Sequence, residues 1–93
     1  MFEELIKLRP CKNKKYLAWI REKGCLVCGQ KAVAHHCEDV MGSRGLSIKH
    51  DLLAVPLCHE HHMEFHTYNI RFWERHNIDI KQTIIGYLVG YFS

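Results

Sequence analysis

The stretch DLLAVPLCHEHHMEFHT, residues 51–67, places an apolar segment directly before a segment rich in histidine. Asp51 to Leu57 is almost entirely apolar, which predicts a buried β-strand, and Pro56 marks it as an edge strand or a strand end. We predict that the next segment, Cys58 to Thr67, forms a helix. This strand and helix would present cysteine and histidine side chains at the point where they join.

Cysteine and histidine spacing predicts a structural zinc site. Cys25 and Cys28 are separated by two residues, which lets two thiolates reach one zinc ion. Cys58 and His61 repeat this spacing at the start of the predicted helix. Together the four residues make a closed tetrahedral set of the structural type. Two other histidines of the same helix compete for the place of His61, namely His59 and His62.

A second metal site is indicated by the remaining histidines. His62 and His66 are four residues apart, so they share one helix face. The third ligand would come from AHHCEDV, residues 34–40, in which His35 or His36 is the natural supplier. Three protein ligands and open positions are what metal catalysis requires. The alternative for any one of these histidines is a solvated surface side chain.

The other elements follow from turn and capping signals. We predict a helix over Lys14 to Lys23 capped by Asn13, a strand over Lys31 to His36, a loop over Cys37 to Lys49, and helices over Ile70 to His76 and Ile80 to Tyr91. The apolar stretch IIGYLVGYF, residues 84–92, is interpreted as core packing, with a dimer contact as the alternative.

Size and composition favour one small globular domain over residues 1–93. A core of this length is thin, and a metal is a common means of stabilising it. Five cysteines, an odd number, and the acidic Phe2-Glu3-Glu4 start argue against a secreted disulfide framework. We therefore expect a soluble cytoplasmic protein. The net charge of +3 suits an anionic partner without establishing one.

The order of these motifs resembles that of the HNH nucleases, also called ββα-metal or His-Me finger nucleases. The motifs are C-x2-C, the doublet HH, HDLLAVPLC and HEHHMEFH, within a core of residues 24–66. The resemblance is greatest to small zinc-stapled members common in phages and prophages, including those similar to phage recombination-enhancement nucleases. It implies an α+β fold: a small ββα-metal core with a zinc knuckle, flanked by N-terminal and C-terminal helices.

The resemblance also implies roles for single residues. His35 would bind the catalytic ion, and His36 would be the general base. Asp51 stands where the family often has asparagine, and would orient that base. His62 and His66 would complete the ion's ligands. In zinc-stapled relatives the second knuckle is usually C-x2-C, so His61 is a departure from the family pattern.

The expected function is that of a metal-dependent DNA endonuclease or nickase with low sequence specificity, acting in phage DNA recombination or processing within a bacterial cell. Its cofactors would be a structural Zn²⁺ and a catalytic Mg²⁺, Mn²⁺, Ni²⁺ or Zn²⁺, with imidazole ligands favouring the metals other than Mg²⁺. Contacts would be mostly to DNA phosphates, from Arg44, Lys49 and His50 and from a basic run at Lys12, Lys14 and Lys15. A homodimer or a recombination-protein partner is a further expectation. The alternative function is a zinc-stapled nucleic-acid-binding module without cleavage.

Overall fold

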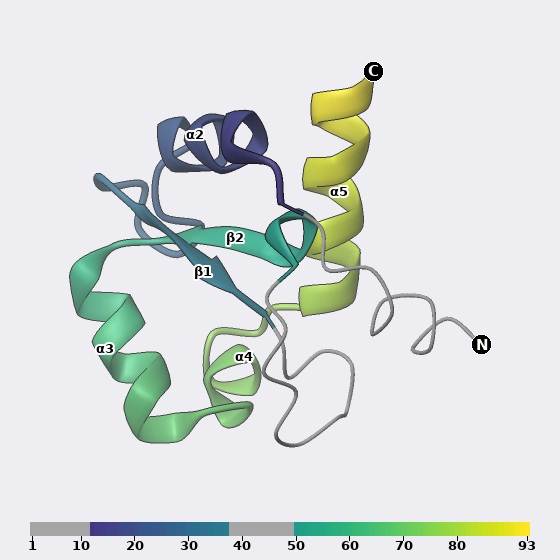
Figure 1. Ribbon diagram of the computed structural model, residues 1–93. Helices are drawn as coiled ribbons and strands as arrows, with labels where there is room; N and C mark the ends of the chain where they lie inside the picture. Colours follow the sequence, from purple (N-terminus) through teal and green to yellow (C-terminus); the bar gives the residue numbers. More distant parts are fainter. Residues whose placement is uncertain (1–11, 38–49) are drawn as a thin grey trace.

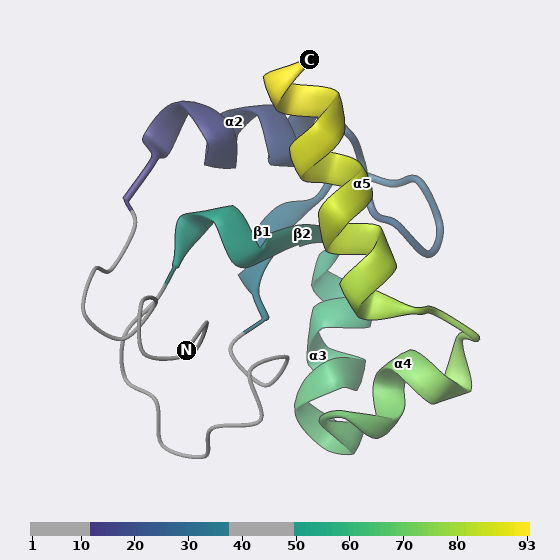
Figure 2. The same ribbon diagram turned by 90° about the vertical axis from the view of Figure 1, so that its right-hand side faces the viewer.

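The computed structural model describes residues 12–37 and 50–93, which form a small α+β unit. Within these ranges a two-stranded sheet lies among four helices (Figure 1). The elements are α2 (Lys14–Glu22), β1 (Val33–His36), the 3₁₀ turn η2 (Asp51–Leu53), β2 (Ala54–Leu57), α3 (His59–Tyr68), α4 (Arg71–Arg75) and α5 (Ile80–Phe92). Figures 1 and 2 agree that α2 lies on one side of the sheet, with α3 and α4 on the other.

The sheet is an antiparallel hairpin of two short strands. Val33 pairs with Leu57 and His36 pairs with Ala54, which sets the register of all four pairs. Every residue of β2 is buried, as the apolar run predicted. Pro56, opposite Ala34, is tolerated because a two-stranded sheet leaves each strand with an unpaired edge.

Both predicted strands were too long. Asp51–Leu53 forms a 3₁₀ turn instead of strand, with the Leu53 amide bonded to the His50 carbonyl at 3.0 Å. The ladder ends where the Cys37 amide donates to the Leu53 carbonyl. At its other end β1 begins at Val33 rather than Lys31, since its partner strand stops at Leu57 and the chain turns into α3. A strand extends only as far as its partner supplies hydrogen bonds.

Side-chain caps set the beginnings of three helices. The Asn13 side chain accepts from the Tyr16 amide at the start of α2, and the Asp79 side chain accepts from the Gln82 amide at the start of α5. The helix predicted from Cys58 begins one residue later, because Cys58 itself is extended and acts as the cap of α3. Cys58 Sγ accepts from the backbone amide of His61, 3.4 Å away.

The core joins the sheet to α3, α4 and α5. Phe65, Phe72 and Trp73 pack together with ring centroids 5.0–5.8 Å apart. Val55, Leu57 and Ile84 are buried in the same cluster. On α2, Tyr16 and Ile20 are fully buried.

Helix α5 buries only one of its faces. Ile84 is buried, and Gly90 lies close to the Trp19 ring, 3.4 Å from a Cβ built at that position. Ile85, Val89 and Phe92 are more than half exposed. The core interpretation of residues 84–92 therefore holds for one face of the helix. Across the described residues, no helix combines the length and apolar character needed to cross a bilayer.

Candidate metal centres

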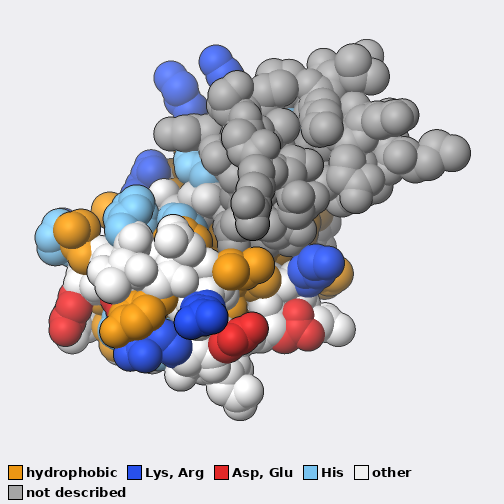
Figure 3. Space-filling view, turned by 90° about the horizontal axis from the view of Figure 1, so that it is seen from below, with side chains coloured by type: hydrophobic (Ala, Val, Ile, Leu, Met, Phe, Trp, Pro, Cys, Tyr) orange, Lys and Arg blue, Asp and Glu red, His pale blue; other side chains and the backbone are white. Residues whose placement is uncertain are grey.

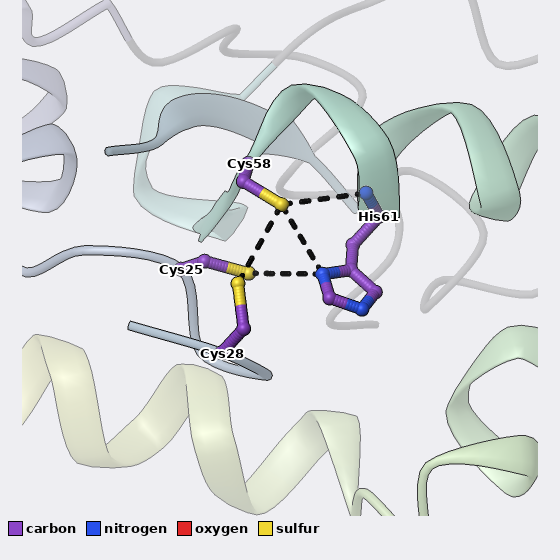
Figure 4. Close-up of side chains that lie close together, drawn as sticks. All are labelled: Cys25, Cys28, Cys58 and His61. Carbon is purple, nitrogen blue, oxygen red and sulfur yellow. Dashed lines mark hydrogen bonds between the residues drawn. The ribbon is translucent and has the colours of Figure 1, made fainter. Parts of the chain in front are cut away.

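Four side chains from two distant segments converge into one cluster (Figure 4). His61 Nδ1 lies 3.1 Å from Cys58 Sγ and 3.6 Å from Cys25 Sγ. Cys28 Sγ lies 3.7 Å from Cys58 Sγ. With Zn–S near 2.3 Å and Zn–N near 2.0 Å, the edges of a tetrahedral site would be about 3.5–3.8 Å. The cluster is therefore close to the size that a four-coordinate zinc ion requires, and it can hold a metal ion.

The backbone of the knuckle directs its two thiols inward. The Gly29 amide donates to the Cys25 carbonyl at 2.7 Å, and the Val27 amide donates to Cys25 Sγ at 3.4 Å. Gly24 and Gly29 both have φ near +80°, a conformation that favours glycine. A Cβ at Gly24 would lie 2.8 Å from the Gly29 carbonyl oxygen, so the turn closes too tightly for a side chain there.

Electrostatics favour the metal-binding form of one thiol. Burial raises the pKa of Cys25, but backbone N–H groups of Cys58, Cys28 and Val27 outweigh it and lower the pKa to about 6. A thiolate is the form that binds zinc. Cys25 and Cys58 are also almost fully buried, which suits a structural ion better than one exchanging with solvent.

A second group of imidazoles joins β1 to α3. The ring centroids of His35 and His62 are 5.0 Å apart, and those of His62 and His66 are 4.8 Å apart. Successive strand side chains leave on opposite faces, so only one member of the doublet can join the helix pair. The structure gives this place to His35, which is 7 % exposed.

The His35 ring is buried and held in its neutral form. Its Nε2 atom is buried and forms no hydrogen bond with any residue that the structure describes. Burial, followed by the nearby His62, His66 and His36, lowers the pKa of His35 to about 4. Burial and then His66 and His59 also lower the pKa of His62. The neutral form of these rings, which binds metals, is thereby favoured.

These three histidines are less tightly arranged than the cysteine cluster. In the described ranges, the sets of donor atoms lying within 4.8 Å of one another are Cys25, Cys28, Cys58 and His61, and His61, Glu64 and His76. The rings of His35, His62 and His66 are therefore neighbours, but their donor atoms do not all lie within 4.8 Å of one another.

His36 is paired with the predicted orienting carboxylate. His36 Nε2 lies 2.9 Å from Asp51 Oδ1, and the backbone amide of Asn13 donates to Asp51 Oδ2 at 2.7 Å. Burial raises the pKa of Asp51, but the hydrogen bonds from His36 and Asn13 outweigh it, and the pKa is lowered. The carboxylate is thus charged and fixed on both oxygens. The Asn13 contact had no signal in the sequence beyond the helix cap.

The residues expected to contact nucleic acid differ in whether the structure describes them and in how exposed they are. Arg44 and Lys49 lie outside the described residues. His50 is 4 % exposed, which is at odds with the surface contact expected of it. Lys12, Lys14 and Lys15 are exposed at the start of α2. Histidine side chains gather on one part of the face in Figure 3.

Sequence reasoning missed a network beside His61. His76 Nε2 lies 2.8 Å from Glu64 Oε2, and Arg75 Nε lies 3.3 Å from the same oxygen. The His76 side chain is only 23 % exposed. Glu64 follows His61 by three residues, so the helix period was a usable signal for that pair. The His76 contact depends on how α4 folds back on α3 and had no such signal.

A small α+β unit with a metal-type cysteine and histidine cluster is the class of protein that these observations define. Residues 1–86 match the family described as Protein of unknown function (DUF968), and the chain belongs to that family. It is 33 % identical over 81 residues to the uncharacterized protein YdfU of Escherichia coli strain K12. That alignment covers 86 % of this chain and 23 % of YdfU, so the chain spans less than a quarter of this relative's length. No solved structure matches the chain.

Proposed function

We propose that the protein is a metal-dependent endonuclease or nickase of the HNH kind that hydrolyses phosphodiester bonds in DNA. The observation that carries this proposal is the meeting of buried His35 with His62, next to the His36–Asp51 pair. A buried imidazole nitrogen without a hydrogen-bond partner among the described residues is costly unless it binds something. A divalent cation would satisfy it.

The proposed reaction divides between ligands and a base. His35, His62 and His66 would hold a divalent cation, which would offset negative charge on the phosphate and on the departing 3′ oxygen. His36 takes a proton from the attacking water. The water oxygen then bonds to phosphorus as the bond to the 3′ oxygen breaks, and that oxygen takes a proton from solvent.

Asp51 prepares His36 for this work. With Nε2 turned to the carboxylate, His36 donates that N–H to Asp51, and Nδ1 carries the lone pair that accepts the proton. The negative charge of Asp51 also stabilises the imidazolium that results. The Asn13 amide holds the other oxygen of Asp51, so the carboxylate is already in position before the reaction begins.

A zinc staple is proposed for the cysteine cluster. Zn²⁺ at Cys25, Cys28, Cys58 and His61 would tie the knuckle after α2 to the first turn of α3. The Leu26 amide also donates to the Pro56 carbonyl at 3.0 Å, so the knuckle is anchored to β2 as well. The staple would thus fix the helix that presents His62 and His66.

Binding to DNA is proposed to be electrostatic and weakly selective. Lys12, Lys14 and Lys15 are exposed, and Lys12 is near enough to Asp51 to help lower the pKa of that carboxyl. Phosphate contacts of this kind are independent of sequence and sensitive to salt. A role in phage DNA recombination or processing is proposed from the resemblance to small phage nucleases.

A second candidate function is a zinc-stapled nucleic-acid-binding module without cleavage. The observation that favours it is the contrast between the compact cysteine cluster and the open arrangement of His35, His62 and His66. A module that only binds nucleic acid does not need a second histidine, His36, beside the proposed ligand His35, and for that reason we favour the enzyme.

The deciding experiment is nicking of supercoiled plasmid by the zinc-loaded chain with added Mg²⁺, Mn²⁺, Co²⁺, Ni²⁺ or Zn²⁺. We expect metal-dependent nicking that falls about 100-fold or more in His36→Ala, the usual scale for losing a general base. His59→Ala, which alters an exposed histidine at the start of α3, is the control and should cut normally. Cleavage by His36→Ala at the wild-type rate would show that His36 is not the general base. DNA binding by the wild-type chain without any nicking would favour the binding module.

A further inference from the structure

The second nitrogen of the ligand His61 requires an acceptor. Its Nδ1 atom faces the sulfurs of Cys25 and Cys58, so Nε2 is the nitrogen on the far side of the ring (Figure 4). A metal-bound histidine almost always donates its other N–H to a carboxylate, a carbonyl or water. That hydrogen bond holds the ring in one tautomer and one orientation and makes the ligand nitrogen more basic.

Glu64 is placed to be this acceptor. It follows His61 by three residues on α3, so the two side chains share a helix face. A ring nitrogen of His61, a carboxylate oxygen of Glu64 and a ring nitrogen of His76 all lie within 4.8 Å of one another. The Glu64 side chain is 24 % exposed, so its hydrogen bonds are partly shielded from water.

The next helix holds this carboxylate in place. His76 and Arg75 both contact Oε2 of Glu64, at 2.8 and 3.3 Å. This leaves the lone pairs of Oε1 for a further donor. The His61 and His76 rings stand at 90° with centroids 5.4 Å apart, so the two imidazoles are neighbours and one carboxylate oxygen lies within 4.8 Å of a nitrogen of each.

We propose that Glu64 is the positioning residue of the zinc staple: its carboxylate accepts the Nε2–H of His61, while Arg75 and His76 hold that carboxylate from α4. This inference rests on the proposed zinc staple. It also explains how the chain can use His61 where zinc-stapled relatives usually have the second cysteine of a C-x2-C pair. A cysteine ligand needs no acceptor behind it, whereas a histidine ligand does, and this chain supplies one.

The same three residues do not make a better metal site of their own. His61 Nδ1 is already among the thiols, and one imidazole joins two metals only after losing its ring proton. Glu64 Oε2 is also engaged by a guanidinium, which competes with a cation for the carboxylate.

The first test is zinc affinity of the full chain, measured by competition with a chelator. Glu64→Ala should bind zinc about 10- to 100-fold more weakly, the usual cost of losing such a partner, and Glu64→Gln should fall between it and wild type. Glu60→Gln, an exposed glutamate one turn earlier on the same helix, is the control and should bind as wild type. With Co²⁺ in place of zinc, the absorption bands of Glu64→Ala should keep the position expected of three thiolates and one nitrogen.

The second test separates positioning from simple support of the fold. In a His61→Cys background the ligand has no ring N–H, so adding Glu64→Ala should not weaken zinc binding further. An equal loss in both backgrounds would overturn the inference while leaving the staple intact, as would binding of a second ion that depends on Glu64. If the wild-type chain binds no zinc, the staple and the inference fall together.

A spectroscopic measurement covers the case in which His61→Cys does not fold. In ¹⁵N-labelled, zinc-loaded protein, His61 should be bound through Nδ1 and show an Nε2–H proton that exchanges slowly. Glu64→Ala should speed that exchange by about tenfold or more, the factor that one lost hydrogen bond of about 1.4 kcal/mol provides. An exchange rate equal to that of wild type would overturn the inference.

Discussion

The Nε2 atom of His36 and the Oδ1 atom of Asp51 lie 2.9 Å apart, which joins the end of β1 to the 3₁₀ turn that precedes β2. The other oxygen of Asp51 accepts the backbone amide of Asn13, at the start of α2. One carboxylate therefore links a strand, a turn and a helix cap. The same contact that would orient a general base also stabilises the fold.

Substitutions of Asp51 should show whether its hydrogen-bond acceptors or its negative charge matter for the reaction. Asp51→Leu removes both acceptors, and we expect plasmid nicking to fall about 10- to 100-fold and stability to fall by about 1–3 kcal/mol, because the Asn13 amide is left without its partner. Asp51→Asn keeps an acceptor oxygen and introduces the residue that the HNH nucleases, which the sequence motifs resemble, often have in the orienting role. It should keep nicking within about tenfold of wild type. Loss of activity in Asp51→Asn equal to that in Asp51→Leu would show that the charge is essential.

The fold was predictable wherever a local signal sets it. Asn13 caps its helix as expected, and the apolar run at residues 54–57 is a buried strand. The C-x2-C spacing and its repeat at Cys58 and His61 predicted which four side chains form a cluster that can hold a metal ion, because short backbone segments fix the spacing within each pair. His61, rather than His59 or His62, completes that cluster.

The errors arose where one segment depends on another. Asp51–Leu53 is apolar enough for a strand, but the hydrogen bonds to the partner strand β1 end at Cys37. The sequence of residues 51–53 does not reveal how long that partner strand is. His76 meets Glu64 only because the chain reverses at Asn69, a residue with φ of 53° between α3 and α4. Buried His50 is a similar case, since its basic neighbours in the sequence suggested a surface position.

Removal of zinc should unfold the protein if the staple is structural. Cys25→Ser should lose the bound zinc and lower the melting temperature strongly, because the free energy of binding structural zinc is part of the free energy of folding. Chelator treatment of the wild type should have the same effect and be reversed by added Zn²⁺. Cys37→Ala, which alters a buried cysteine outside the cluster, should cost about 1 kcal/mol and retain one zinc ion per chain. An unchanged melting temperature of Cys25→Ser would contradict the proposed structural zinc site.

The two glycines of the knuckle should respond differently to alanine. Both have positive φ, at 77° for Gly24 and 78° for Gly29, so each substitution costs about 1–2 kcal/mol of backbone strain. At Gly24 the added Cβ would also meet the Gly29 carbonyl oxygen at 2.8 Å, whereas nothing lies within 4 Å at Gly29. We expect urea unfolding to show Gly24→Ala as the less stable variant by more than about 1 kcal/mol. Equal stability would mean that the turn opens freely and does not preform the zinc ligands.

Acid should destabilise the protein through His35. Its pKa is about 4 in the folded chain, against an ordinary value of 6.5, because burial penalises the charged ring. Above pH 6.5 both states hold His35 neutral and the stability is fully present. As the pH falls from 6.5 towards 4, the unfolded chain takes up a proton that the folded chain refuses, so stability is lost by up to about 1.4 kcal/mol per pH unit.

The measurement for His35 is a comparison with His35→Leu, with both proteins loaded with zinc and no second metal added. Loss of zinc in acid affects both chains, so it cancels in the difference between their unfolding free energies. That difference should change with pH between 6.5 and 4, with the wild type becoming less stable relative to His35→Leu, and should be flat above 7. Parallel curves over the whole range would mean that His35 is hydrated in solution, and the buried nitrogen that supports the cation site would be lost with it.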